Sequence, residues 1–342
     1  MDELRTLARK LGFLFATMFA LITALFTGLL TYTPDSRVSL SSMDPIRKLE
    51  AWHPRDITQN ATQAPSRVRK GYELVAHTAD YLGPEAPDPE MRFTGNHMNC
   101  TSCHLKAGTQ AGAASWVGVA ARFPQFGGRS NRVGTLEDRI NGCMERSMNG
   151  RKLPVDSEPM QAMVAYMEWL GEDLPEAEAA AYQGFPRLKI PEGAVDLQAG
   201  EAVYAKDCAV CHGAGGQGIS KPDGGYIYPP LWGPDSFNDG AGMHRVLTAA
   251  QFIKGNMPYG LATRESPVLT DEEAFQVAGY INSFDRPHKT GTEADYPDRT
   301  LKPVSTPYGP WADDFSPQQH QYGPFPPIIA YYKEYYNLTK TK

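Results

Sequence analysis

Cysteine is scarce in this chain, which has five cysteines among 342 residues. An excess of positive charge is absent as well, because the formal net charge is -6 at pH 7. Such a chain lacks the broadly basic surface that attracts nucleic acid, so we expect no nucleic-acid partner. Four of the five cysteines lie in two short motifs, and only Cys143 lies outside them. The cysteine content therefore indicates two similar sites and one cysteine with a separate role.

Both motifs have the pattern C-x-x-C-H, which is typical of c-type haem attachment. Two thiols about one helical turn apart can each bond a vinyl group of the porphyrin, and the adjacent histidine then reaches the iron from the same side. Disulfides or a zinc site are the alternatives, but zinc gives no reason for a histidine directly after each pair. We expect two covalently bound c-type haems, attached through Cys100, Cys103 and His104 in the first motif and through Cys208, Cys211 and His212 in the second.

Charged residues are missing from residues 11–32. At about 1.5 Å rise per residue, a helix of this length crosses a bilayer core of about 30 Å. Arg5, Arg9 and Lys10 precede it, which predicts a cytoplasmic N-terminus over residues 1–10. We favour a single-pass anchor in a bacterial inner membrane, with the haem domains in the periplasm. The alternative is a soluble periplasmic protein released from a cleaved signal peptide.

Apolar residues at three- and four-residue spacing predict several helices in the rest of the chain. Thr270 and Glu273 form a capping-box signature at the start of the last one. Each half of the chain has a haem motif near its start and an apolar helix further on, which is the layout of a small cytochrome c domain. The predicted helices cover residues 66–82, 135–148, 157–170 and 270–284.

These patterns predict an all-α fold of two cytochrome c-type domains, with an N-terminal transmembrane helix and an extended C-terminal arm. The arm is rich in proline but also in aromatic residues, which disordered segments lack, so we expect it to pack over the domains. The predicted boundaries are 11–32 for the anchor, 33–65 for a linker, 66–180 for the first domain with the catalytic haem, 181–290 for the second domain with the electron-transfer haem, and 291–342 for the arm.

The second axial ligand of each iron decides what each haem does. For the second haem the candidate is Met257, which lies in a Pro/Gly-rich loop after the second motif, and Lys254 and His244 are nearby alternatives. A methionine ligand raises the reduction potential, as suits an electron-transfer haem. For the first haem the candidates are Cys143, Met144, Met148 and His97.

Cys143 has a specific feature in its favour. In a helix, Arg139 and Ser147 would share its face, and a cysteine beside arginine tends to be a thiolate, the form that binds metal and attacks sulfur. The alternative is a small buried apolar residue, as free cysteines often are. The surrounding segment is basic in an acidic chain, which suits a small anionic substrate. Its basic residues are Arg122, Arg129, Arg132, Arg139, Arg146, Arg151 and Lys152, opposed by Glu137, Asp138 and Glu145.

A known family shares these features. The first motif, the block over residues 136–150 around Cys143, Asn256-Met257-Pro258 and the tail motifs Tyr308-Gly309-Pro310 and Tyr322-Gly323-Pro324-Phe325 resemble the dihaem thiosulfate dehydrogenases. These enzymes also act as tetrathionate reductases and are related to the SoxA cytochromes. The resemblance extends over residues 66–328. The apparent N-terminal anchor departs from the better-known soluble members.

The resemblance implies that Cys143 ligates the first, catalytic haem, and that Met257 ligates the second. It also implies that Arg129, Arg139 and Ser147 line the substrate pocket. The expected activity joins two thiosulfate ions to tetrathionate, in either direction. Electrons would pass from the first haem to the second, and on to a cytochrome c or a membrane respiratory complex. The alternatives are a membrane-anchored dihaem electron-transfer cytochrome without substrate chemistry, and a SoxA-like subunit that acts on a carrier protein.

Overall fold

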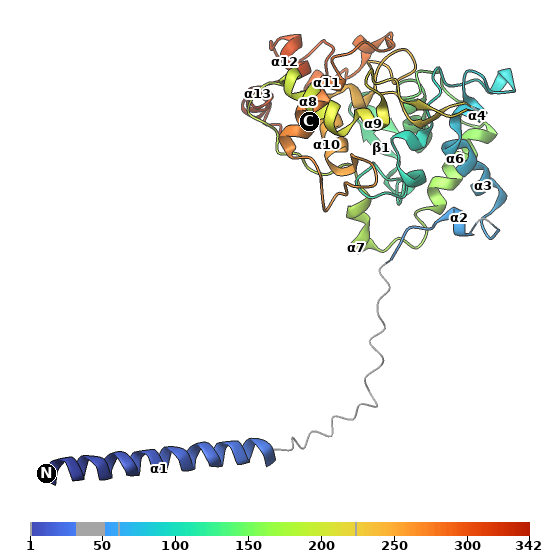
Figure 1. Ribbon diagram of the computed structural model, residues 1–342. Coiled ribbons are helices and arrows are strands. Elements are labelled where there is room, and N and C mark those ends of the chain that lie inside the picture. Colours follow the sequence, from blue (N-terminus) through green and yellow to red (C-terminus); the bar gives the residue numbers. More distant parts are fainter. Residues whose placement is uncertain (1, 32–51, 61, 223) are drawn as a thin grey trace. The chain divides into compact units, whose positions relative to one another are not determined.

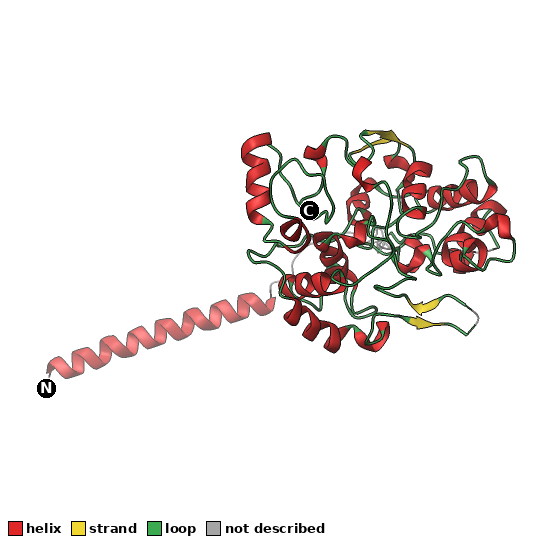
Figure 2. Ribbon diagram, turned by 90° about the horizontal axis from the view of Figure 1, so that it is seen from above, coloured by secondary structure: helices red, strands yellow, loops and turns green. Residues whose placement is uncertain are grey.

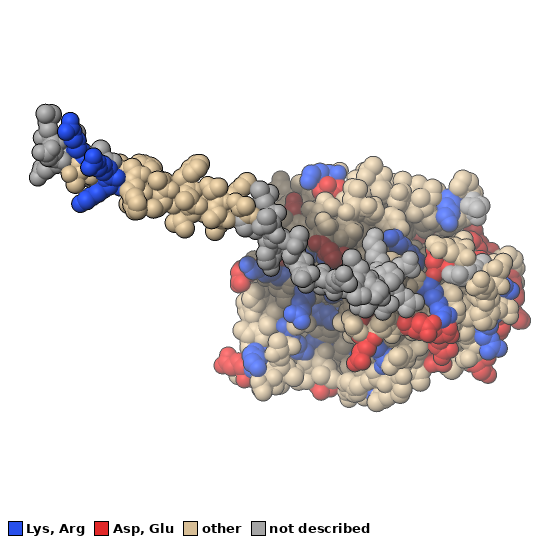
Figure 3. Space-filling view, turned by 90° about the horizontal axis from the view of Figure 1, so that it is seen from below, with Lys and Arg blue, Asp and Glu red and all other residues tan. Residues whose placement is uncertain are grey.

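The computed structural model describes residues 2–31, 52–60, 62–222 and 224–342, and the chain forms two separate units (Figure 1). The first unit contains the helix α1 (Asp2–Thr31). Its stretch Arg9–Thr27 is long and apolar enough to cross a membrane, a property that a signal sequence shares. Figure 3 shows an uncharged surface along α1, with basic side chains gathered toward its N-terminal end.

The second unit begins at Trp52 and includes part of the expected linker over residues 33–65. Residues 33–51 lie outside the described part of the chain. Ile57, in the short helix α2 (Ile57–Asn60), is buried in the core of the first domain. Arg55 forms ion pairs with Glu172 and Asp173. Residues 52–60 and 62–65 therefore differ from the expected extended linker, because they pack onto the first domain.

The first domain is helical, and its haem motif lies between two packed helices. The helix expected over 66–82 is interrupted at His77, where the backbone leaves helical geometry. The helix expected over 135–148 ends earlier, at Met144, and only a short antiparallel hairpin precedes it. The elements are α3 (Ser66–Ala76), α4 (Thr78–Leu82), β1 (Gln125–Gly127), β2 (Arg132–Gly134), α5 (Leu136–Met144), α6 (Glu158–Trp169) and α7 (Glu176–Ala179).

The second domain repeats this plan. The capping box of Thr270 and Glu273 is present, with both reciprocal hydrogen bonds, at the start of its last helix. Figure 2 shows that helices dominate and that the strands form only small hairpins, which an all-α description omits. The elements are α8 (Leu197–Asp207), α9 (Ala209–His212), β3 (Ile219–Ser220), β4 (Tyr226–Tyr228), α10 (Val246–Asn256) and α11 (Asp271–Ile281). One-turn 3₁₀ helices cover Pro89–Met91, Cys100–Ser102, Lys106–Gly108, Ala120–Arg122, Ala180–Tyr182, Gly242–His244, Thr292–Ala294 and Arg299–Leu301.

In each domain the first and last helices cross at a glycine. A Cβ atom on Gly71 in α3 would overlap the Ala162 carbonyl of α6 and lie 2.8 Å from the Cβ atom of Tyr166. A Cβ atom on Gly200 in α8 would overlap the Gln276 carbonyl of α11 and lie 2.8 Å from the Cβ atom of Tyr280. The missing side chain lets the two backbones approach closely, as at other small-residue helix contacts.

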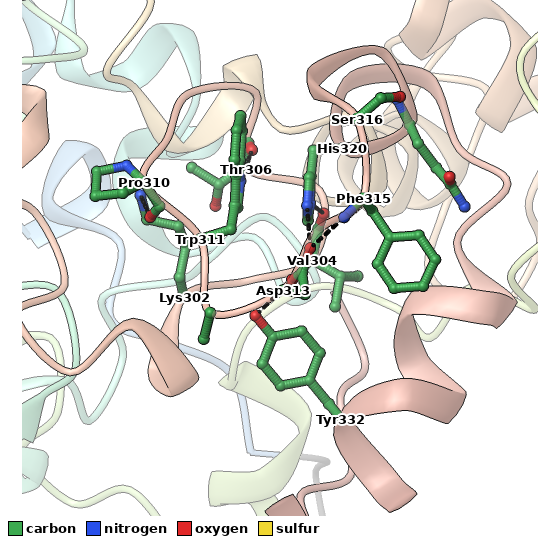
Figure 4. A network of polar contacts seen from close by, with 12 residues as sticks. Lys302, Val304, Thr306, Pro310, Trp311, Asp313, Phe315, Ser316, His320 and Tyr332 are labelled. Atoms are coloured by element: carbon green, nitrogen blue, oxygen red, sulfur yellow. Dashed lines mark hydrogen bonds and ion pairs between the residues drawn. The ribbon is translucent and has the colours of Figure 1, made fainter. Parts of the chain in front are cut away.

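The arm also contains helices, α12 (Pro317–Tyr322) and α13 (Pro326–Tyr336), and is not simply extended. Phe325, Ile328 and Tyr332 of the arm are buried in the core of the second domain. Figure 4 shows the polar network beneath them. The Nε2 atom of His320 lies 2.9 Å from an Asp313 oxygen, and the Tyr332 hydroxyl donates to the other oxygen at 2.7 Å. The arm is therefore part of the folded unit.

Candidate haem sites and catalytic cavity

The first motif is positioned by the break between α3 and α4. This break places Thr78 beside the motif, where its hydroxyl accepts a hydrogen bond from the Cys100 backbone N–H at 3.1 Å. Both cysteines of the motif are free thiols. The Nδ1 atom of His104 lies 2.8 Å from the Ala114 carbonyl oxygen, which fixes the ring and leaves Nε2 for a metal. Next to the motif lies a cavity of about 170 Å³, lined mainly by apolar side chains.

The second motif has the same local arrangement. Cys208 and Cys211 are free thiols, and the Nδ1 atom of His212 lies 2.8 Å from the Pro229 carbonyl oxygen. Burial lowers the pKa of His212, so its ring is neutral and able to bind iron. In both motifs the donor set of two free thiols and one oriented imidazole fits a covalently attached c-type haem.

The candidates for the second axial ligand of each iron differ in the hydrogen bonds and ion pairs that they already form. Met257 follows α10 at the edge of the second domain's core, whereas Lys254 pairs with Asp271 at 2.6 Å. His244 bonds the Asp239 carbonyl through Nδ1 at 2.9 Å. In the first domain His97 pairs with Asp235 at 3.0 Å, whereas Cys143, Met144 and Met148 all line the cavity next to the motif. Lys254, His244 and His97 are thus engaged with other groups.

Cys143 lies on α5, which begins with a capping box of Thr135 and Asp138. The Nη1 atom of Arg139, one turn earlier, donates to the Cys143 sulfur at 3.3 Å, as expected for helical spacing. Burial raises the pKa of the Cys143 thiol, but the charge of Arg139 and the nearby His104 ring outweigh it and bring the pKa down to about 6. Cys143 is therefore a thiolate at neutral pH.

The haem-motif cysteines have the opposite electrostatics. Burial raises the pKa of Cys100 to about 11, and the pKa values of Cys103 and Cys208 to about 12. No arginine contributes to the pKa shifts of these three thiols. The environment of Cys143 therefore differs from that of Cys100, Cys103 and Cys208.

The basic segment around Cys143 divides into paired and unpaired side chains. Among the described residues, Arg122 and Arg139 have no carboxylate partner within ion-pair distance. Arg129 donates to the Gly240 carbonyl at 3.0 Å and lies 3.8 Å from Asp295. The remaining members pair as Arg132 with Asp138 at 2.8 Å, Arg146 with Asp295 at 2.8 Å, and Lys152 with Glu145 at 3.9 Å, while Arg151 stacks 3.9 Å over Phe93.

A cavity of about 600 Å³ brings the expected site residues together. Arg129, Arg139, Cys143 and Ser147 all line it, and it also reaches His104 of the first motif. Ser147 lies beyond the end of α5, but it still faces the cavity. The arrangement places one thiolate among unpaired or partly paired guanidinium groups. Such a cavity can hold small anions close to a sulfur nucleophile.

Sequence reasoning missed a further part of the cavity lining. Arg245 and Thr248 come from the start of α10, and Asp295 and Tyr296 come from the arm. The hydroxyl of Tyr296 accepts a hydrogen bond from Arg245 at 3.3 Å. No local pattern marks these residues, because they reach the site only through the packing of the second domain and the arm against the first. Loops of the second domain add to that packing, since Asn238 donates to the Glu145 carbonyl at 2.9 Å.

Comparisons with known proteins agree with this architecture. Residues 92–175 match the family model "SoxA/TsdA, cytochrome c domain", and residues 195–281 match "Cytochrome C oxidase, cbb3-type, subunit III". The chain therefore has two cytochrome c domains and binds two c-type haems.

Several thiosulfate dehydrogenases are similar to the chain. That of Allochromatium vinosum is 47% identical over 63% of this chain and 79% of the relative, and that of Psychrobacter arcticus is 42% identical over 67% and 66%. The solved "as isolated" thiosulfate dehydrogenase TsdBA of Marichromatium purpuratum is 35% identical with a TM-score of 0.62, over 70% of this chain and 50% of that one. The match thus spans about two thirds or more of the curated relatives and half of the solved chain. On this identity and coverage, the chain belongs to the dihaem thiosulfate dehydrogenase family.

Proposed function

We propose that this protein oxidises thiosulfate, joining two thiosulfate ions to one tetrathionate and releasing two electrons, and that it can run the reverse reaction. The carrying observation is the Cys143 thiolate, which contacts Arg139 and faces His104 inside a cationic cavity. The similar thiosulfate dehydrogenases support the same chemistry.

The same residues would hold the haems: Cys143 and His104 would ligate the first iron, and Met257 and His212 would ligate the second. When bound, the first haem accepts electrons and the second haem passes them on. Thiolate ligation lowers a haem's reduction potential relative to methionine ligation, so transfer from the first haem to the second is downhill.

Arg129 and Arg139 bind the two thiosulfate dianions, which repel each other. Charge-assisted hydrogen bonds from guanidinium groups are among the stronger ones in proteins, and both side chains line the cavity beside Cys143. Ser147 adds a hydroxyl donor on the same wall. These residues orient the sulfane sulfur of thiosulfate toward the Cys143 sulfur and neutralise its charge.

Once its sulfur has left the iron, Cys143 acts as the nucleophile in two balanced steps. Its thiolate and the sulfane sulfur of one thiosulfate form an S–S bond, giving a cysteine S-thiosulfonate and two electrons. The sulfane sulfur of a second thiosulfate attacks the outer sulfur of that bond. Tetrathionate forms, and the electron pair of the broken S–S bond returns to Cys143 as thiolate. No proton is taken up or released.

The surface around the second motif is suited to electron exit. Val210, inside the motif, is 78% exposed, and Leu261, after the Met257 loop, is 71% exposed. Ile227 on β4 is another exposed apolar residue nearby in the domain. Exposed apolar residues beside a redox centre permit brief contact with a partner. The acceptor is a cytochrome c or a membrane respiratory complex.

We place the protein in the bacterial inner membrane, with α1 as a single-pass anchor and the haem domains in the periplasm. The apolar stretch of α1 supports this placement. Release into the periplasm after signal cleavage is the alternative.

Cys143→Gly tests the mechanism. In a thiosulfate–ferricyanide assay the variant is expected to lose nearly all activity while retaining both haems, because the nucleophile and its charge pair with Arg139 are gone. The control is Cys143→Ser, which keeps the side-chain size but lacks a thiolate, and which we expect to be inactive as well. Full activity in the haem-loaded glycine variant would instead favour a dihaem electron carrier or a mechanism without cysteine chemistry.

A further inference from the structure

The start of α10 forms an unassigned part of the cavity wall. No side chain caps this helix, whose N-cap residue is Arg245. The first backbone N–H groups of a helix have no partner within it, and the helix dipole makes this end attractive to anions. Thr248, in the first turn, lines the same cavity and is 5% exposed. Its hydroxyl has no hydrogen-bond partner among the residues that the structure describes.

Arg245 brings a positive charge to this position without an acidic partner. Its guanidinium donates to Tyr296 at 3.3 Å and to the Gly242 carbonyl at 3.4 Å, and no described carboxylate forms an ion pair with it. Burial lowers its pKa, and the charges of Arg129 and Arg139 act in the same direction. An unpaired charge in such a place is costly unless an anion binds there.

Tyr296 is held beside Arg245 in an uncommon backbone conformation. Its φ angle is +61°, in the left-handed region that a bulky side chain rarely adopts. Its backbone N–H donates to the Arg129 carbonyl at 2.8 Å, which links the arm to the first domain. Strained residues of this kind cluster at ligand-binding positions. The ring is buried between Arg129 and Lys302, with its hydroxyl on Arg245.

We propose that Arg245, Thr248 and Tyr296 form a second anion subsite, which binds the sulfonate group of the second thiosulfate. The same subsite binds the distal sulfonate of tetrathionate. A sulfonate has three acceptor oxygens, and the subsite offers a guanidinium, two hydroxyls and the free N–H groups of α10. The first sulfonate binds next to this subsite, at Arg129 and Arg139, with Arg129 lying 5.7 Å over the Tyr296 ring. This inference rests on the proposed function.

Tetrathionate binding to the fully oxidised holoprotein tests the subsite. Without an electron donor no turnover occurs, so titration calorimetry measures affinity alone. We expect Arg245→Gln to weaken tetrathionate binding by roughly 10- to 100-fold and Thr248→Val by roughly tenfold, as for lost hydrogen bonds to a charged ligand. The valine variant should melt no lower than the wild type, because the hydroxyl that it removes has no partner in the ligand-free protein.

Arg286→Gln is the matched control. Arg286 is half-buried like Arg245, donates to the backbone carbonyls of Leu231 and Ile281, and lies outside the cavity lining. It should leave tetrathionate affinity unchanged. Wild-type affinity in both Arg245→Gln and Thr248→Val would overturn the subsite. So would unchanged affinity in Arg245→Gln together with a shifted reduction potential of the first haem, since the guanidinium would then serve the haem.

The wild type separates this inference from the proposed function. If it neither oxidises thiosulfate nor binds tetrathionate, the proposed function itself is wrong. If it does both and the variants match it, only the second subsite is wrong. The inference stands when the wild type binds tetrathionate and the two subsite variants bind it more weakly than Arg286→Gln.

Discussion

At the scale of single residues, neighbouring charge decides what a buried side chain does. Among the thiols with shifted pKa values, only that of Cys143 has a lowered pKa, because Arg139 is one helical turn away. Cys100, Cys103 and Cys208 of the haem motifs lack such a neighbour and have raised pKa values. A residue type in a motif thus indicates the kind of chemistry, and its surroundings decide its charge.

Histidine 244 provides a prediction about stability and pH. Burial and the charge of Arg286 lower the pKa of His244 to about 4, from an ordinary value of 6.5. Between these values the unfolded chain binds a proton that the folded chain does not, so stability falls as the pH falls from about 6.5 to about 4. His244→Gln should reduce this loss by up to about 3 kcal/mol, measured by urea unfolding at pH 7 and pH 4.5.

The exposed residue His53 supplies the control for that measurement. His53→Gln should keep the wild-type response to acid. If the unfolding free energy of His244→Gln falls between pH 7 and pH 4.5 by as much as that of the wild type, His244 does not govern stability in that range.

At the scale of secondary-structure elements, each domain contains the same kind of crossing between its first and last helices. Gly71 and Gly200 each allow a helix backbone to approach its partner near a tyrosine, Tyr166 or Tyr280. The sequence pattern predicted the last helix of each domain and the first helix of the first domain, but not α8. The predicted boundaries were less accurate. The helix over 66–82 breaks at His77, because Thr78 bonds the haem motif, and hydrophobic periodicity carries no information about that contact.

Gly200→Ala tests the crossing of α8 and α11. The added methyl group would overlap the Gln276 carbonyl, so the helices must separate, and we expect a loss of about 2–3 kcal/mol in unfolding free energy. The measurement is urea unfolding of the holoprotein, followed by haem absorbance. Gly142→Ala is the control, because Gly142 is also helical but has no atom within 4 Å of the added Cβ. It should be neutral or stabilising by up to about 1 kcal/mol. Equal midpoints for the two variants would contradict the close contact.

At the scale of the whole molecule, residues 52–342 are one folded unit whose cavity has walls from both domains and the arm. The arm contributes to the core of the second domain and brings Asp295 and Tyr296 to the cavity. The second unit has its own cores, and it requires no contact with α1 to be compact.

The role of α1 follows from this independence. Residues 52–342, exported behind a cleavable signal peptide, should be found in the soluble periplasmic fraction with the full-length protein's KM for thiosulfate. If α1 is an anchor, the full-length protein should stay in the membrane fraction after a carbonate wash, because α1 is long and apolar enough to span a bilayer. A soluble full-length product whose N-terminus lies after α1 would show instead that α1 is a cleaved signal.

The sequence by itself determined the cofactors, the two-domain plan and the basic segment around Cys143. These depend on neighbours along the chain: the spacing of C-x-x-C-H, the helical period and the one-turn distance from Arg139 to Cys143. The tertiary structure alone decided which basic residues are paired, and it placed Arg245, Thr248 and Tyr296 in the same cavity as Cys143. Those contacts join residues far apart in the chain, and they form only when the cores of the second domain and the arm pack against the first domain.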